Sequence, residues 1–205
     1  MIEEKILITS KDEELNDALK KIDEHIDSLK LGKKDALHLR LISEEMLGMM
    51  SSLTGRYRAF MWYERSVKEA KVFLTAKTDN MRIDAKKGLL SVSSSGKNVS
   101  TKGFMGKIGD IIENGLLNFE NIMEIEQQYG GGYMGYSNMG NMSADSVLAW
   151  SLSQYRNSLK NEIDGENEAE WDELEKSIVA SLAKDVIVGV KKTQVDMTVI
   201  MEIKE

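Results

Sequence analysis

The chain has 205 residues, of which 41% are hydrophobic and 30% are charged, a balance typical of a globular protein with its own core. The formal net charge of −7 and the sequence pI of about 5.1 argue against nucleic acid as the main partner, because binding to a phosphate backbone requires a basic surface. The chain has no Cys and only two His, which excludes disulfides, thiol nucleophiles and cysteine-ligated zinc and argues against a multi-histidine metal site.

The sequence shows no feature of export or of membrane insertion. No apolar run approaches the roughly 20 residues that a membrane span requires. Residues 1–5 are charged from the start and do not form a signal peptide. We therefore expect a cytoplasmic protein that does not cross a membrane.

The first quarter of the chain predicts a short strand at residues 5–9, followed by two helices. Ser10 begins a capping box for the first helix. Each helical segment carries one apolar stripe at alternating spacings of three and four, formed by Leu15, Leu19, Ile22, Ile26 and Leu29 and then by Leu39, Ile42, Met46, Met49 and Leu53. We expect Gly32 to end the first helix as a C′ glycine, Asp35 to cap the second helix, and Gly55 to end it.

Two strands are expected next. Residues 57–64 are rich in aromatic side chains, and residues 70–78 alternate between apolar and polar, with a polar hairpin loop at 65–69 between them. Asp79 and Asn80 then predict an acidic turn at which the second strand stops.

The middle of the chain changes in character. Residues 85–109 contain five lysines and no acidic residue, with loop composition at Ser93–Asn98. A helix with Ile108, Ile112, Phe119 and Ile122 on one side is expected to follow. Residues 129–142 are rich in Gly, Met, Tyr and Asn and predict a loop, after which Ser143 is expected to cap a helix that carries Leu148, Leu152, Tyr155 and Leu159.

The last quarter predicts a helix and two strands. Residues 162–175 are densely acidic and contain no base, and a helix marked by Trp171, Leu174, Ile178 and Leu182 begins among them. Residues 186–190 predict a strand, and the regular alternation of residues 195–203 gives the final strand one buried face.

The layout of residues 37–80 resembles the nucleotide-binding fold of the GHKL superfamily, which includes histidine kinases, gyrase B, Hsp90 and anti-sigma-factor kinases. In that fold a helix carries a glutamate that positions water, followed four residues later by an asparagine that helps to hold magnesium. Glu45 stands at the glutamate position, and Met49 stands four residues on. A thioether does not replace an oxygen ligand for a hard cation. The resemblance therefore implies a nucleotide site that lacks the usual ligand for Mg²⁺, with Glu45 as a weak catalytic base.

The resemblance also assigns a base-binding role to the segment after the second strand. The family's aspartate there accepts from the adenine amino group, and Asp79 with Asn80 matches the start of that motif. Met81 and Ile83 stand where the family has glycines. The alternative from composition alone is an ordinary Asp-Asn turn between strands.

The lysine-rich segment corresponds in position to the lid that covers phosphates in this family. Gly103, Gly106 and Lys107 precede a helix, and exposed amides at a helix start attract anions when ammonium groups lie close by. With Lys97, these residues are the expected phosphate contacts, although their spacing does not match a Walker P-loop. A solvated loop with scattered lysines, or a docking surface for the acidic residues 162–175, are the alternatives.

We expect an α+β two-layer sandwich with a mixed, mostly antiparallel sheet and helices on one face. The resemblance covers residues 1–84 and 168–205, whereas residues 85–167 form a lid-like basic loop and a central helical insertion. The middle is closer to a group of bacterial ATP-binding-like proteins that share the Glu44–Gly48 helix motif and the Ser93–Asn98 loop.

The leading functional interpretation is a degenerate nucleotide-binding regulatory protein that binds ATP or ADP with weak or no phosphoryl transfer. One alternative is a non-enzymatic interaction scaffold, with residues 129–142 as a partner surface and a homodimer among the partners considered. A third is an active anti-sigma-type serine kinase, which needs another magnesium ligand such as Asn80, Asn98 or Asn114.

Overall fold

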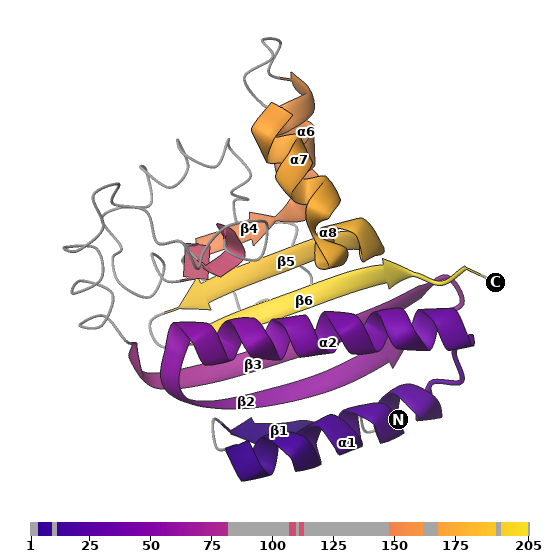
Figure 1. The fold of residues 1–205 in the computed structure, drawn as a ribbon, viewed down its shortest axis with the longest axis vertical. Coiled ribbons are helices and arrows are strands. Elements are labelled where there is room, and N and C mark those ends of the chain that lie inside the picture. Colours follow the sequence, from indigo (N-terminus) through magenta and orange to yellow (C-terminus); the bar gives the residue numbers. More distant parts are fainter. Residues whose placement is uncertain are drawn as a thin grey trace.

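The computed structural model describes residues 4–9, 12–81, 107–109, 111–112, 148–161, 168–191 and 194–204. These residues form an α+β fold with one sheet and a layer of helices (Figure 1). In chain order the elements are β1 (Ile6–Thr9), α1 (Asp12–Ser28), α2 (Lys33–Leu53), β2 (Thr54–Arg65), β3 (Glu69–Met81), β4 (Leu148–Ser151), α6 (Leu152–Asn161), α7 (Glu168–Lys176), α8 (Ile178–Leu182), β5 (Ala183–Lys191) and β6 (Gln194–Glu202).

The sheet has six strands in the order β1-β2-β3-β6-β5-β4, and each neighbouring pair runs antiparallel. The expectation of a mostly antiparallel sheet is confirmed, and the described strands include no parallel pair. Because β6 lies between β3 and β5, the last strand of the chain joins the N-terminal hairpin to the C-terminal one.

Helices α1, α2 and α8 lie on the same face of this sheet, with α2 crossing in front of the central strands (Figure 1). Hydrogen bonds from two tyrosines of β2 show that α2 lies on the side to which these tyrosines point. Tyr63 is hydrogen-bonded to Ser43 of α2, and Tyr57 is hydrogen-bonded to Ser51. Alternate residues of the strands point to the same side and are buried, as expected from the pleat of a strand. This buried row is formed by Ile6 and Ile8, Ala59 and Met61, Val72, Leu74 and Ala76, Val186, Val188 and Val190, and Val195, Met197, Val199 and Met201.

The junction between α1 and α2 differs from the sequence prediction. The left-handed residue is Lys30 with φ 54°, and Gly32 instead accepts the first hydrogen bond of α2 from the Ala36 amide. Asp35 lies inside the first turn of α2 and accepts from the Lys204 amide at 3.2 Å. Gly32 is therefore the N-cap of the second helix, and the buried Asp35 ties that helix to the segment after β6.

The second strand of the hairpin is longer than predicted. β3 continues to Met81, so Asp79 and Asn80 lie in a strand and the expected turn at these residues is wrong. The partner strand β2 begins at Thr54, directly after α2, and Met81 pairs with Thr54. Pairing to β2 supplies hydrogen bonds that the local Asp-Asn sequence does not reveal.

Two predicted helices differ from the elements that the structure shows. Leu148 lies in strand β4, paired with Val190, and the helix begins only at Leu152. Part of the segment that we assigned to a helical insertion thus adds an edge strand to the sheet. The predicted helix through residues 171–182 is broken at Ser177, which caps α8, so that Ile178 is exposed and Val179 and Ala180 are buried instead.

The remaining predictions for the strands hold. β6 alternates between buried and half-buried residues along its length, as expected, and β5 and the hairpin of β2 and β3 are present. No helix in the described part of the chain combines the length and the apolar character needed to cross a membrane.

Candidate functional site

The two adjacent glutamates of α2 have different surroundings. Residues one position apart on a helix point about 100° apart. Glu44 is half-buried and accepts from Arg40 Nε at 3.0 Å, whereas Glu45 is exposed. The carboxylate that the resemblance selects, Glu45, is therefore available to solvent, and its neighbour is part of the packing between helices.

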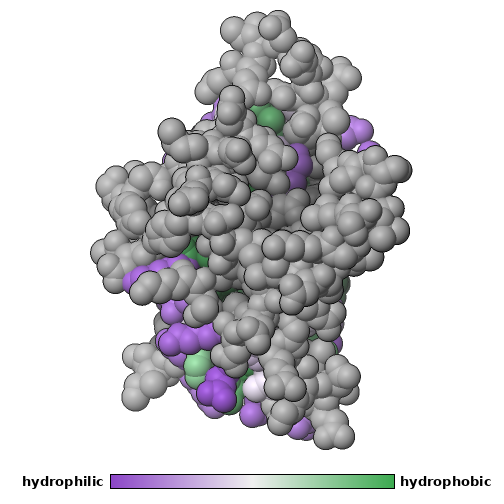
Figure 2. Space-filling view, turned by 90° about the vertical axis from the view of Figure 1, so that its left-hand side faces the viewer, coloured by the Kyte–Doolittle hydropathy of each residue, from purple (hydrophilic) through white to green (hydrophobic). Residues whose placement is uncertain are grey.

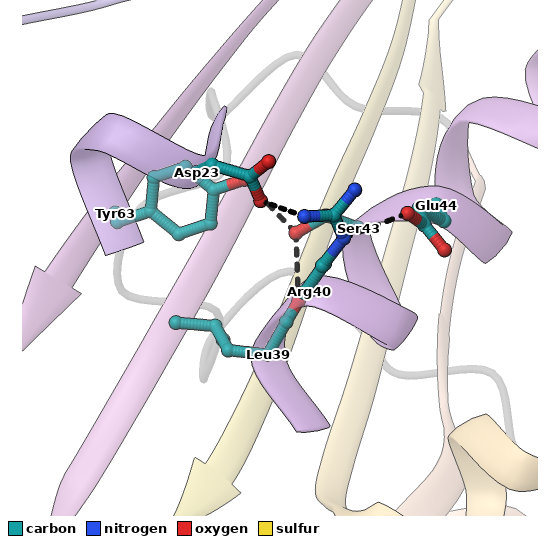
Figure 3. A network of polar contacts seen from close by, with 6 residues as sticks. All are labelled: Asp23, Leu39, Arg40, Ser43, Glu44 and Tyr63. Atoms are coloured by element: carbon teal, nitrogen blue, oxygen red, sulfur yellow. Dashed lines mark hydrogen bonds and ion pairs between the residues drawn. The ribbon is translucent and has the colours of Figure 1, made fainter. Parts of the chain in front are cut away.

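Arg40 links the two N-terminal helices (Figure 3). Its guanidinium donates to Glu44 on its own helix and to Asp23 on α1. The Glu44 hydrogen bond and the charges of Asp23 and Glu44 raise the pKa of Arg40 above its ordinary value, against a smaller opposing effect of burial. These three side chains fix the position of α1 against the helix that carries Glu45.

Beneath this ion pair lies a buried polar contact (Figure 3). Ser43 Oγ donates to the Leu39 carbonyl at 2.8 Å and lies 2.9 Å from the hydroxyl of Tyr63, which also approaches Met61 Sδ at 3.1 Å. Burial raises the pKa of Tyr63 well above its usual range, partly offset by the Ser43 hydrogen bond. The phenol therefore stays protonated and joins α2 to β2.

The magnesium ligand that the resemblance implies has no equivalent on α2. Met49, four residues after Glu45, is 7% exposed and belongs to the core, which confirms its expected packing role. Gly48, four residues after Glu44, has no side chain, and a Cβ added there would meet nothing within 4 Å. Neither position offers an oxygen to a hard cation. The described residues contain no group of three or more His, Cys, Asp or Glu placed to hold a metal ion.

Asp79 occupies a bulge at the end of β3. Tyr57 pairs with Thr78 and Arg56 pairs with Asn80, so Asp79 is the extra residue opposite two consecutive residues of β2. A bulge bends the strand locally, and such irregularities occur often beside functional sites. The side chains of residues 78–81 lie outside the described part of the structure.

The bulge lies at the same end of the sheet as the last turn of α2, because α2 runs directly into β2 and Thr54 pairs with Met81 (Figure 1). Glu45 precedes the end of α2 by about 12 Å along the helix axis, at 1.5 Å per residue. Figure 2 faces this side of the molecule, and the described residues visible on it are mostly hydrophilic, with small hydrophobic spots between them.

The lysine-rich segment is described only at its end. Lys107 donates to the hydroxyl of Tyr155 at 2.9 Å and lies over that ring, while Ile108, Ile111 and Ile112 are fully buried. The expected helical stripe is thus confirmed for Ile108 and Ile112. The other expected phosphate contacts and loop residues, Lys97, Gly103, Gly106, Asn98, Asn114 and residues 129–142, lie outside the described residues.

A second polar cluster holds the C-terminal helices on the sheet. Asp185 of β5 accepts from the Ser153 amide and hydroxyl, both at 2.9 Å, at the start of α6. Arg156 of α6 donates to the carbonyls of Ala180, Ala183 and Lys184 at the end of α8. Burial lowers the pKa of Arg156, partly compensated by the nearby Asp185 charge. The cluster fixes α6 and α8 relative to β5.

The sequence interpretation missed the linking roles of Arg40 and Arg156, because each arginine contacts a segment distant in the chain. It also missed the sheet face opposite the helices, although the alternation of Arg58, Phe60 and Trp62 along β2 carries that signal. Comparisons of the chain with protein-family models, with curated proteins and with solved structures gave no match.

Proposed function

We propose that this protein is a degenerate GHKL-type nucleotide-binding regulatory protein that binds ATP or ADP with weak or no phosphoryl transfer. In this proposal the base is recognised by Asp79 at the end of β3, and the phosphates lie toward the lysine-rich segment that begins after Met81.

The arrangement of the elements supports the proposal. A helix that carries Glu45, two strands, and a final helix with a pair of strands are what the resemblance implies for this family. Here they belong to one antiparallel sheet that is covered on one face by α1, α2 and α8. Two segments far apart in the chain thus form a common framework.

The single observation that carries the proposal is the bulge at Asp79, at the end of the sheet where α2 ends. A bulged residue leaves the regular pairing of the two strands, so the backbone at Asp79 departs from the register of β3 with β2. Glu45 is exposed on the adjoining helix and Gly48 leaves the helix surface open. These features suit a purine nucleotide: Asp79 provides a carboxylate acceptor, Glu45 an exposed acid, and Gly48 an open backbone surface.

Weak or absent catalysis follows from the residues of α2. Phosphoryl transfer depends on metal ions and positive groups that stabilise the charge on the transferred phosphoryl. The side chain four residues after Glu45 is the buried thioether of Met49, which does not suit Mg²⁺. We therefore derive no catalytic step through magnesium, and Glu45 remains as a carboxylate that can orient water.

Titration with a fluorescent ADP analogue tests the proposal. We expect Asp79→Ala to weaken binding by about tenfold or more, the loss typical of a hydrogen bond to a charged group. Asp172→Ala, which removes an exposed carboxylate of α7, is the matched control and leaves binding unchanged. Replacing Mg²⁺ by a chelator changes the affinity less than about threefold, since no strong ligand for the metal stands on α2.

Two other outcomes would decide against this function. Absence of binding at millimolar nucleotide favours the non-enzymatic scaffold, which keeps the sheet and helices without a ligand. Magnesium-dependent ATP turnover that disappears in Glu45→Gln favours the active kinase.

A further inference from the structure

The sheet face opposite the helices carries a distinct set of side chains. Tyr57, Ala59, Met61 and Tyr63 of β2 are buried beneath α2, so the alternate residues of this strand point to the other side. The register extends this second face across the sheet, because residues directly opposite each other share a face. It is the face turned away from the viewer in Figure 1.

Aromatic side chains lie on this face. Trp62 and Phe73 are cross-strand partners whose rings stack at 5.1 Å with an interplanar angle of 4°, and Lys5 Nζ lies 4.2 Å from the centroid of Trp62. In the next row, Leu7 and Phe60 are opposite each other and are 49% and 41% exposed. Leu7 and Phe60 therefore form a small apolar spot beside the stacked rings.

A cationic pair borders the aromatic side chains. Arg58 of β2 and Lys77 of β3 are directly opposite each other, and both are exposed. Like charges in this position destabilise a sheet. A carboxylate on this face, Asp196, accepts instead from Thr75 at 2.7 Å and from Gln194. In the described part of the chain, no carboxylate pairs with Arg58 or Lys77.

The sheet contains a like-charge pair that is compensated. Glu69 and Glu202 are also directly opposite each other, and there Lys184 donates to Glu69 at 2.6 Å. Within the described residues, the Arg58 and Lys77 pair lacks such compensation, so its two cations are open to an anionic ligand. An anionic partner removes the repulsion between the two cations.

We infer that this face binds single-stranded nucleic acid. A base stacks on the exposed ring of Phe60, and the phosphates contact Arg58 and Lys77. Same-face residues two positions apart on a strand are separated by roughly 7 Å, so a strand that crosses the sheet can place bases on one row and phosphates on the next.

The combination of chemistries selects this partner. A nucleic acid strand offers a flat apolar surface and a negative charge in every residue, and unpaired bases leave their faces open for stacking. An acidic peptide matches Arg58 and Lys77 but offers a stacking surface to Phe60 only where it carries an aromatic residue. The net charge of −7 disfavours nucleic acid over the molecule as a whole, so this binding depends on the local cations of the face.

Fluorescence anisotropy with a labelled oligouridylate of about 12 nucleotides at low salt tests the inference. We expect micromolar binding that weakens as salt rises. Arg58→Glu with Lys77→Glu reduces the affinity at least about tenfold. The matched control, Lys20→Glu with Lys34→Glu, makes the same change in net charge at exposed cations of α1 and α2 and leaves binding close to that of the parent protein.

The aromatic contribution is measured separately. Phe60→Ala, at an exposed position, reduces affinity by about fivefold or more if a base stacks on the ring, and circular dichroism checks that the variant folds. Phe60→Ala leaves binding of the fluorescent ADP analogue unchanged, so this inference and the proposed function fail independently.

Three results overturn the inference. The first is equal loss of binding in the Lys20 and Lys34 control, which shows a non-specific charge effect. The second is equally tight binding of polyphosphate, which has no bases. The third is capture of the protein by vesicles of phosphatidylserine and phosphatidylcholine without any binding of the oligonucleotide, which assigns the face to a membrane surface.

Discussion

At the scale of single residues, neighbours distant in the chain decide the role of each polar side chain. Glu44 and Glu45 are equivalent in sequence, but Arg40 and Asp23 hold the first in the contact between helices and leave the second exposed. The ion pairs of Arg40 are about 40% exposed, so each contributes only about 0.2–1 kcal/mol to stability. Their role is to orient α2 rather than to hold the fold together.

Tyr63 gives a prediction at this scale. Tyr63→Phe removes the hydroxyl from Ser43 and lowers the free energy of unfolding by about 1 kcal/mol near neutral pH, the net value of one hydrogen bond. Because burial raises the pKa of Tyr63 in the folded state above its ordinary value of 10.0, its contribution is complete below pH 10.0 and is lost as the pH rises further. Urea unfolding followed by circular dichroism, at neutral and alkaline pH, measures both effects.

The variant is expected to lose less stability on alkalinisation than the parent protein, since it has no phenol to ionise. Ser43→Ala is the control, because it removes the hydrogen bond and keeps the buried phenol, and hence the steep dependence on pH. An equal alkaline slope in Tyr63→Phe and in the parent protein contradicts the buried phenol as its source.

At the scale of elements, helix ends are set by contacts as much as by local sequence. Helix α1 ends at Ser28. The amides of the next two residues, Leu29 and Lys30, donate back to the carbonyls of Ile26 and Asp27. Arg65 of β2 donates to the carbonyls of Leu29 and Lys30. The arginine of β2 thus satisfies carbonyls that a helix end leaves without partners. This lets a lysine occupy the left-handed position that a glycine usually takes.

Lys30 gives a prediction at this scale. Its φ of 54° costs an L-residue with a Cβ about 1 kcal/mol, so Lys30→Gly is expected to raise the free energy of unfolding by about 0.5–1 kcal/mol. Lys30→Ala keeps the Cβ and is expected to leave stability unchanged. Thermal and urea unfolding compare the three proteins, and an equal gain in Lys30→Ala assigns the effect to the lost side-chain charge instead of the backbone.

At the scale of the whole molecule, the insertion of β6 between β3 and β5 makes one cooperative sheet from both ends of the chain. Polar contacts between distant segments reinforce it. Asp35 of α2 accepts from the Lys204 amide, and Lys184 of β5 reaches across β6 to Glu69 of β3. These contacts join the N-terminal and C-terminal halves at the same end of the sheet.

The pair formed by Glu69 and Lys184 gives a prediction at this scale. The Lys184 hydrogen bond holds the pKa of Glu69 below its ordinary value of 4.5. The stability that this carboxylate contributes is therefore present above pH 4.5 and is lost as the pH falls through its lower folded-state pKa. In Lys184→Gln, the pKa of Glu69 is expected to rise toward 4.5, as followed by NMR of its carboxyl carbon.

Lys68→Gln, which removes a nearby exposed charge at the hairpin turn, is the control and leaves the Glu69 titration in place. Salt at about 1 M is expected to reduce the difference between Lys184→Gln and the parent protein, since both side chains are partly exposed. A Glu69 titration that is unchanged in Lys184→Gln contradicts the role of the ion pair.

The sequence by itself determined the elements whose pattern is regular over many residues. The apolar stripes of α1 and α2 and the alternation of β2, β3 and β6 specify both the kind of element and its buried face. The sequence also determined that Met49 is a core residue, because its position in the apolar stripe of α2 places it on the buried face of that helix. Local periodicity is enough where a single face is buried.

Only the tertiary structure decided the features that depend on a partner strand or helix. β4 is a strand because β5 offers it hydrogen bonds, and β3 continues through Asp79 because β2 extends beside it. The different surroundings of Glu44 and Glu45, and the placement of Arg58 opposite Lys77, arise from residues that the fold brings together from a distance. The physical reason is that hydrogen bonds and charges act between neighbours in space, whereas the sequence orders only neighbours along the chain.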